Sequence, residues 1–136
     1  MYLVSPFLTL STLSPLCLTT IIERLARGLE RIGKDCNIQT IRLMDVKMGD
    51  AGVIGLAEFL RVNHQLKRLL MPVNQLSSTG IATLAAALHA HPSLHTLDLS
   101  LNNNMFGGAD EGGLKQVGDM LRSDSALLRL DLQSNG

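Results

Sequence analysis

Residues 66–76, LKRLLMPVNQL, decide the fold because their pattern returns at a fixed distance along the chain. The alternation of Leu69 and Met71 is typical of a short strand with one buried face. The same phrase starts at four places: Ile38-x-x-Ile41-x-Leu43, Leu66-x-x-Leu69-x-Met71, Leu94-x-x-Leu97-x-Leu99 and Leu127-x-x-Leu130-x-Leu132. The first three starts are 28 residues apart and the fourth follows after 33. A fixed period of this length predicts a solenoid, in which each unit buries its apolar face against the next.

Each strand phrase is followed by a predicted helix. In the unit that starts at Leu66, residues 77–79 (Ser-Ser-Thr) are suitable capping residues, and Ile81, Leu84 and Leu88 follow at helical spacing. Gly80 stands at the helix start, where a side chain could obstruct close packing. The equivalent helix residues of the neighbouring units are Gly52, Val53, Leu56 and Leu60, and Gly113, Leu114, Val117 and Leu121. Strand, turn and helix therefore make up one repeating unit.

Asn74 stands where the chain must turn away from the strand. We expect its amide to point inward and to hydrogen-bond backbone groups of the neighbouring turns, which no sheet ladder serves. Asn102 and Asn135 hold the same position in later units. The unit that starts at Ile38 has Val46 there instead, so we expect its turn to be looser.

The N-terminal part is predicted to be a degenerate first unit. Stepping back one period places a helix over residues 19–32, and Thr20-x-x-Glu23 has the form of a capping box. Its strand is expected around residues 10–13, with Pro15 at an inward position. We therefore divide the chain into an uncharged leader or degenerate strand, 1–18, and a repeat domain, 19–136. That domain comprises the degenerate unit 19–37, units that start at 38, 66 and 94, and a truncated unit from 127.

These phrases resemble the leucine-rich repeat, in the 28–29-residue ribonuclease-inhibitor-like class. The family pattern Leu-x-x-Leu-x-Leu-x-x-Asn-x-Leu is met by residues 66–76 and in part by 94–104 and 127–135. The resemblance implies an α/β solenoid, a partial horseshoe with parallel strands on the concave face and helices on the convex face.

The composition argues against several classes of function. The net charge is zero, with 46% hydrophobic and 18% charged residues, so no nonspecific attraction to nucleic acid or to an anionic membrane is expected. Residues 1–18 lack the basic start and cleavage site of a signal peptide. Cys17 and Cys36 are too few for a disulfide framework, and free thiols indicate a reducing, cytoplasmic setting.

The residues between the inward leucines should face outward from the concave surface. Met44, Leu70 and Pro72 combine there with Arg and Asp, which is typical of a protein-binding patch with apolar anchors and a charged rim. The predicted partner-binding residues are Thr40, Arg42, Met44, Arg68, Leu70, Pro72, Asp98, Ser100, Arg129, Asp131 and Gln133. In the longer third unit, Met105 and Phe106 are predicted to make loop contacts.

Catalytic, cofactor and metal sites are not expected. His89, His91 and His95 span a helix end, a proline and a strand start, so their rings need not converge. Phosphate-binding and nucleophile motifs are missing from the sequence. The leading hypothesis is therefore a non-catalytic module that binds a partner protein.

Three alternatives remain open. The repeat type is similar to that of Ran GTPase-activating proteins, which implies a regulator of a small GTPase. Residues 55–63 (GLAEFLRVN) resemble the repeat domain of tropomodulin-type actin-filament cappers. Innate-immune receptors use the same repeat. Because the unit from Leu127 stops before a helix, we also expect either a longer array or self-association through this uncapped repeat.

Overall fold

The computed structural model describes residues 7–11, 37–102, 112–123 and 126–135. Its strands are β1 (Phe7–Ser11), β2 (Thr40–Met44), β3 (Arg68–Leu70), β4 (Thr96–Asp98) and β5 (Arg129–Asp131). Its helices are α2 (Gly49–Val62), α3 (Ser78–Leu88) and α4 (Gly112–Arg122). In the described part of the chain no helix is long and apolar enough to cross a membrane.

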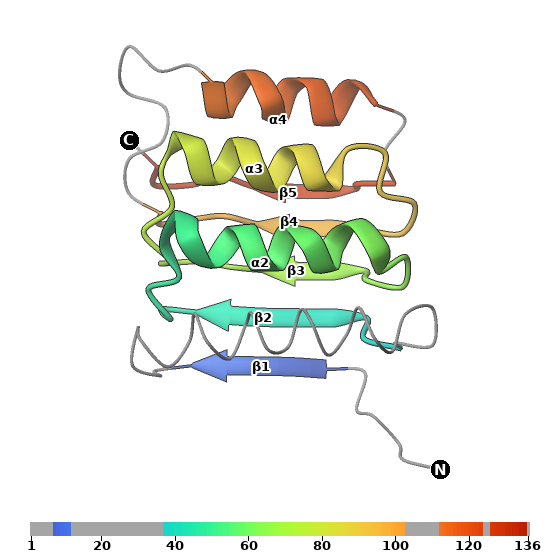
Figure 1. Ribbon diagram of the computed structural model, residues 1–136, viewed down its shortest axis with the longest axis horizontal. Helices are drawn as coiled ribbons and strands as arrows, with labels where there is room; N and C mark the ends of the chain where they lie inside the picture. The colour runs from blue at the N-terminus through green and yellow to red at the C-terminus, as the bar shows by residue number, and fades with distance from the viewer. Residues whose placement is uncertain (1–6, 12–36, 103–111, 124–125, 136) are drawn as a thin grey trace.

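The five strands form one sheet, in which every neighbouring pair is parallel and the spatial order equals the order in the sequence (Figure 1). Ile41 pairs with Leu69, Leu69 with Leu97, and Leu97 with Leu130. The predicted alignment of the four strand phrases is therefore confirmed. The alignment also holds for β5, whose phrase follows the preceding one after 33 residues instead of 28.

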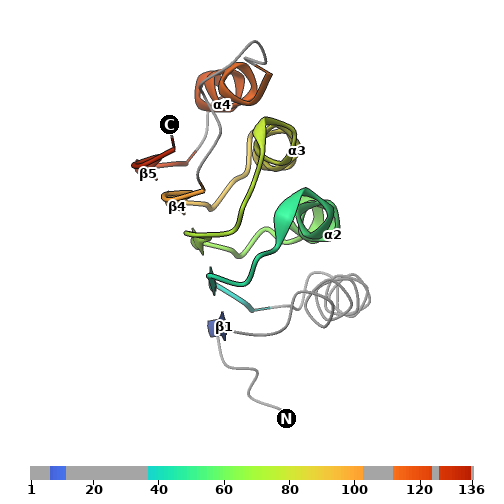
Figure 2. The ribbon, with the colours of Figure 1, turned by 90° about the vertical axis from the view of Figure 1, so that its left-hand side faces the viewer.

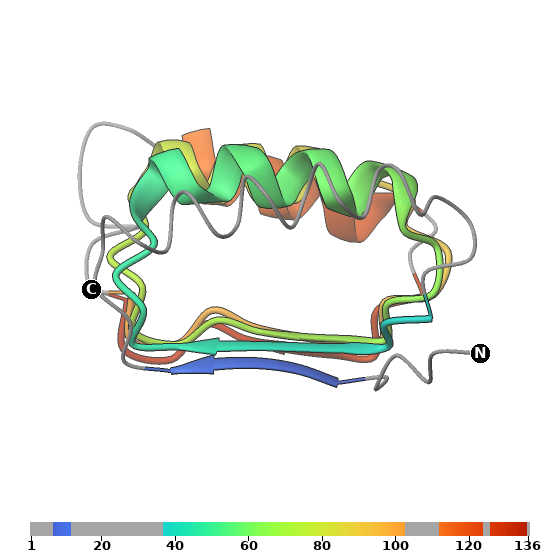
Figure 3. The same ribbon diagram turned by 60° about the horizontal axis from the view of Figure 1, so that its bottom comes forward.

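The helices lie on one side of the sheet, as the views in Figures 2 and 3 show. In Figure 2 the helices spread further apart than the strands, which places the strand layer on the inside of the curve. We refer to the exposed side of this strand layer as the inner face. The α/β architecture with a parallel sheet is compatible with a leucine-rich repeat fold.

The core lies between the two layers and is built from the repeated apolar positions. Leu69 and Leu97 point into it from the strands, and Ile81, Leu84 and Leu88 close it from α3; all five are buried. Helix α3 packs against both α2 and α4. The apolar residues that recur every 3.6 residues in the helices and every two residues in the strands are thus buried in the same core.

Strand β1 lies closer to the N-terminus than expected. β1 pairs Leu8 with Ile41 and Leu10 with Leu43, which is an offset of 33 residues instead of 28. The strand therefore spans residues 7–11 and not 10–13, because the first interval is longer than the period that was extrapolated. Pro15 and the expected helix at 19–32 lie outside the described residues.

Two residues of α4 differ from their equivalents in the earlier helices. Leu114 and Leu121 were expected in the core, but they are 49% and 48% exposed. In α2 and α3 the residues at these positions are buried, and each of these helices packs against the helix that follows. The described residues place no further helix beside α4, and these two side chains stay half uncovered.

Candidate functional site

A ladder of asparagine side chains sets the conformation at the end of each strand. Asn102 Oδ1 accepts a hydrogen bond from the Asn74 N–H at 2.7 Å, while its Nδ2 donates to the carbonyl oxygen of Met71 at 3.0 Å. Asn135 repeats the arrangement, because its Oδ1 accepts from the Asn102 N–H at 2.7 Å. Both donors and acceptors of the buried turns are satisfied in this way. The predicted inward position of these amides is confirmed.

The turn at Val46, which was expected to be looser, has the backbone conformation of the next turn but a longer hydrogen bond than the 2.7 Å found at Asn74 and Asn102. The N–H groups of Val46 and Met48 both donate to Asn74 Oδ1, at 3.3 and 3.4 Å. Asp45 before it has φ of 50°, close to the 59° of Val73 one unit later. The turn receives its amide from Asn74 in the next unit, so it keeps its conformation without an asparagine of its own.

The inner face carries a compact cluster of basic and apolar side chains on β2 and β3, which we call the Arg–Leu cluster: Arg42, Met44, Arg68 and Leu70. Arg42 and Leu70 are partners in the β2–β3 register. Both arginines are exposed, Met44 is 49% exposed and Leu70 is half buried. Within the described residues, neither guanidinium group has a hydrogen-bond or ion-pair partner.

Two predicted contact residues are not available on this face. Pro72 is buried, and its carbonyl oxygen accepts from the Asp45 N–H at 3.1 Å. β3 ends at Leu70, so the alternation of a strand no longer directs Pro72 outward. Thr40 is buried as well, in a strand that is paired on both sides, with β1 and with β3.

The other half of the inner face is acidic. Asp98 and Asp131 are neighbours in the β4–β5 register and half buried. Asp98 Oδ1 accepts from the N–H and the hydroxyl of Ser100, at 2.9 and 2.7 Å. Asp131 Oδ1 accepts from the Gln133 N–H at 3.0 Å, and its Oδ2 lies 3.9 Å from the guanidinium of Arg129. One oxygen of each carboxylate thus stabilises a turn.

Along one row of the sheet, the residues read basic, apolar, acidic and acidic: Arg42, Leu70, Asp98 and Asp131. The charge therefore changes sign across the face. The predicted loop contacts Met105 and Phe106 lie outside the described residues, so the structure does not position them.

The histidines do not converge on a common point. The described residues contain no group of three His, Cys, Asp or Glu side chains that could hold a metal ion. His91 is buried, with Nε2 2.8 Å from the carbonyl oxygen of Asn63, and its ring meets that of His64 edge to face at 6.5 Å. Burial lowers the pKa of His91, the hydrogen bond to Asn63 opposes this, and His64 adds to the lowering.

His91 and Asn63 are instead buried polar residues at equivalent positions of adjacent units, which the sequence analysis did not identify. Asn63, one period earlier, accepts from the N–H groups of Gln65 and Leu66, at 3.0 and 2.8 Å. His91 Nδ1 faces the Ser93 N–H at 3.5 Å in the equivalent position. The 28-residue spacing of Asn63 and His91 was the signal that could have revealed this structural role.

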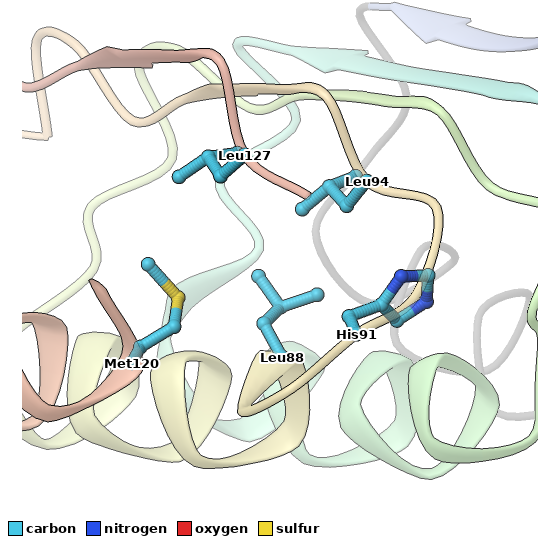
Figure 4. A pocket seen from close by; sticks show the side chains of 5 residues that line it. All are labelled: Leu88, His91, Leu94, Met120 and Leu127. Carbon is cyan, nitrogen blue, oxygen red and sulfur yellow. The ribbon is translucent and has the colours of Figure 1, made fainter. Parts of the chain in front are cut away.

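A small apolar hollow lies between the ends of α3 and α4 and the strand starts (Figure 4). Its lining residues are Leu88, His91, Leu94, Met120 and Leu127. Its volume of about 10 Å³ is no larger than one water molecule requires. It offers no room for an organic ligand, so the inner face is the stronger candidate site.

Comparison with known proteins relates the chain to repeat proteins. No family model matches it. The chain is 31% identical over 107 residues, 78% of its length, to human "NACHT, LRR and PYD domains-containing protein 13", and 35% identical over 68 residues, half of its length, to human "NACHT, LRR and PYD domains-containing protein 12". It is 25% identical over 108 residues, 79% of its length, to leiomodin-2 from Rattus norvegicus.

The chain spans only 10%, 6% and 19% of these relatives. Two of their names include the leucine-rich repeat. Together with the parallel sheet, the similarities support a chain of leucine-rich repeat type, and repeats of this type fit a protein-interaction module.

Proposed function

We propose that this chain is a non-catalytic leucine-rich repeat solenoid of the ribonuclease-inhibitor-like class, with 28-residue units, and that it binds a partner protein across its inner face. The observation that carries the proposal is the Arg–Leu cluster. It brings two arginines without ion-pair partners in the described residues next to half-exposed Met44 and Leu70.

This combination suits a protein partner better than a small molecule. Arginine and methionine are enriched at protein interfaces, where a desolvated apolar centre is surrounded by a polar rim. The guanidinium groups can each bind a carboxylate in a bidentate manner. We therefore expect the partner to present an apolar contact flanked by acidic side chains opposite β2 and β3.

The acidic half of the inner face would determine the orientation of the bound partner. Asp98 and Asp131 would favour basic groups of the partner opposite β4 and β5. Charges of this kind affect the association rate and the choice of partner more than the affinity. A partner docked in the reverse direction would meet like charges on both halves.

The test compares two charge-matched triple variants in affinity capture from lysate with quantitative mass spectrometry. The first carries Arg42→Glu, Met44→Glu and Leu70→Glu on the inner face. The control carries Arg61→Glu, Ile54→Glu and Val62→Glu on α2, where all three side chains are exposed. We expect the wild type and the control to retain the same proteins and the inner-face variant to lose them. Retention by all three folded proteins would exclude this surface.

A second candidate is binding to actin-filament ends. It is favoured by the phrase at residues 55–63 and by the match with leiomodin-2. Elongation of purified actin filaments, measured with and without the chain, separates the two candidates. The same inner-face and α2 variants then show which surface is responsible for any effect.

A further inference from the structure

The two arginines of the Arg–Leu cluster occupy diagonal positions on the neighbouring strands β2 and β3 (Figure 1). Arg68 on β3 pairs with Thr40, whereas Arg42, two residues further along β2, pairs with Leu70. Neighbouring strands are about 4.8 Å apart and a strand rises about 3.3 Å per residue, so the two arginine Cα atoms are about 8 Å apart. Arginine side chains are long enough for both guanidinium groups to reach one ligand between them.

The charge of these two side chains favours a ligand with more than one negative charge. Both arginines are exposed, and within the described residues neither guanidinium group has a hydrogen-bond or ion-pair partner. A single carboxylate can neutralise only one of two guanidinium groups that repel each other. A phosphoryl group on a side chain carries a charge of about −1.5 to −2 at neutral pH and three strong acceptor oxygens, so it can bind both.

The apolar residues of the cluster lie two residues further along the same strands. Met44 follows Arg42, and Leu70 follows Arg68, on the same face of the sheet because the side chains of a strand alternate. This step is about 6.6 Å long, which is also the advance of an extended peptide over two residues. A peptide that lies along β2 and β3 with its phosphoryl group between the arginines therefore places a side chain two residues away over Met44 and Leu70.

We propose that the Arg–Leu cluster binds a phosphorylated serine or threonine of a partner protein, in a segment with an apolar side chain two residues from the phosphorylated one. Arg42 and Arg68 bind the phosphoryl oxygens, and Met44 and Leu70 contact the apolar side chain. This assignment rests on the function proposed above and names the chemical group that the inner face recognises.

The acidic half of the inner face favours a phosphorylated peptide over a nucleic acid. Asp98 lies beside Leu70 in the β3–β4 register, and Asp131 lies beside Asp98. A nucleic acid carries one phosphate per nucleotide, so a strand that crosses the sheet would bring further phosphates close to these carboxylates. A peptide with one phosphoryl group avoids this repulsion.

The test measures the fluorescence anisotropy of a labelled peptide that is titrated with the full chain. The peptide has one phosphoserine, with leucine two residues before it and two residues after it and glycine elsewhere, so that it can bind in either direction. We expect it to bind at least about tenfold more tightly than its unphosphorylated form, because it gains charge-assisted hydrogen bonds. Replacement of both leucines by alanine should weaken the binding.

Arg42→Gln and Arg68→Gln should each weaken binding of the phosphorylated peptide by about tenfold. Arg129→Gln is the matched control, because Arg129 is an exposed arginine of the same face that already has Asp131 at 3.9 Å. It should leave the affinity unchanged, and circular dichroism verifies that the variants are folded. Equal binding of the two peptide forms, or equal weakening by Arg42→Gln and Arg129→Gln, would overturn the proposal. Tighter binding of a single-stranded oligonucleotide than of the phosphorylated peptide would also overturn it.

A second measurement separates this proposal from the function on which it rests. The capture from lysate is repeated after the lysate has been treated with a protein phosphatase. Proteins that the wild type retains and the inner-face triple variant loses should also be lost after dephosphorylation. If they are still retained, the inner face binds its partner without phosphate, so the proposed function stands and the phosphoryl site is excluded. If no protein depends on the inner face in either lysate, both are excluded.

Discussion

The Nε2 atom of His91 lies 2.8 Å from the backbone carbonyl oxygen of Asn63, the residue one 28-residue period before it. The imidazole therefore donates from Nε2, while Nδ1 is left as the acceptor that faces the Ser93 N–H. Asn63 performs the same task with its amide oxygen toward Leu66. A histidine and an asparagine thus stabilise equivalent loops of adjacent units.

The buried His91 makes stability dependent on pH. Burial lowers its pKa in the folded chain below the ordinary value of 6.5, so the unfolded chain binds the proton more readily. The stabilisation is complete above pH 6.5 and is lost as the pH falls through that value toward the folded pKa. We expect the free energy of unfolding, measured with urea between about pH 7.5 and about pH 5, to decrease in this direction.

His91→Asn copies the residue of the preceding unit and should flatten that pH profile. His89→Asn, at an exposed position, is the matched control and should leave the slope unchanged. An equal slope in wild type and His91→Asn would show that another group titrates.

Asn102 is expected to be among the most sensitive polar residues. Asn102→Leu removes acceptors for the N–H groups of Asn74 and Leu76 and a donor to the carbonyl oxygens of Met71 and Leu99. Each buried group left without a partner costs about 1–3 kcal/mol, so we expect a loss of about 3 kcal/mol or more in urea unfolding. Gln65→Leu, at an exposed site, should change stability by less than about 0.5 kcal/mol.

Two helical glycines should respond in opposite ways to alanine. A Cβ at Gly80 would overlap Asp50, whose carboxylate accepts from the N–H and the hydroxyl of Ser77, the N-cap residue of α3. Gly80→Ala should lower stability by about 1–3 kcal/mol through this overlap. Gly118 has no heavy atom within 4 Å of the position that a Cβ would take, so Gly118→Ala should raise stability by about 0.5–1 kcal/mol. Thermal unfolding of both variants is the measurement; a similar shift in both would contradict the packing argument.

Backbone conformation at the turns can be improved. Val73 has φ of 59°, which is unfavourable for a β-branched residue. Val73→Asn should raise the free energy of unfolding by about 0.5–1 kcal/mol, because asparagine tolerates the left-handed region. Gly49 has φ of 57° with open space around it, so Gly49→Ala should cost about 1 kcal/mol through backbone strain alone. Destabilisation by Val73→Asn would show that its half-buried contacts outweigh the strain.

The sequence by itself determined the strand alignment and the asparagine ladder. Leu69, Leu97 and Leu130 could be placed in register in advance because a one-residue slip would turn every buried leucine toward water. The inward amides of Asn74 and Asn102 followed from the backbone groups that each turn leaves unpaired.

Only the tertiary structure decided which positions are covered and by which neighbour. Pro72 is buried because β3 ends two residues earlier, while Leu121 is half exposed although its equivalents Leu60 and Leu88 are core residues. A periodic pattern specifies the direction in which a side chain points. Its burial depends on the units beside it, and those contacts join residues that lie a full repeat apart in the chain.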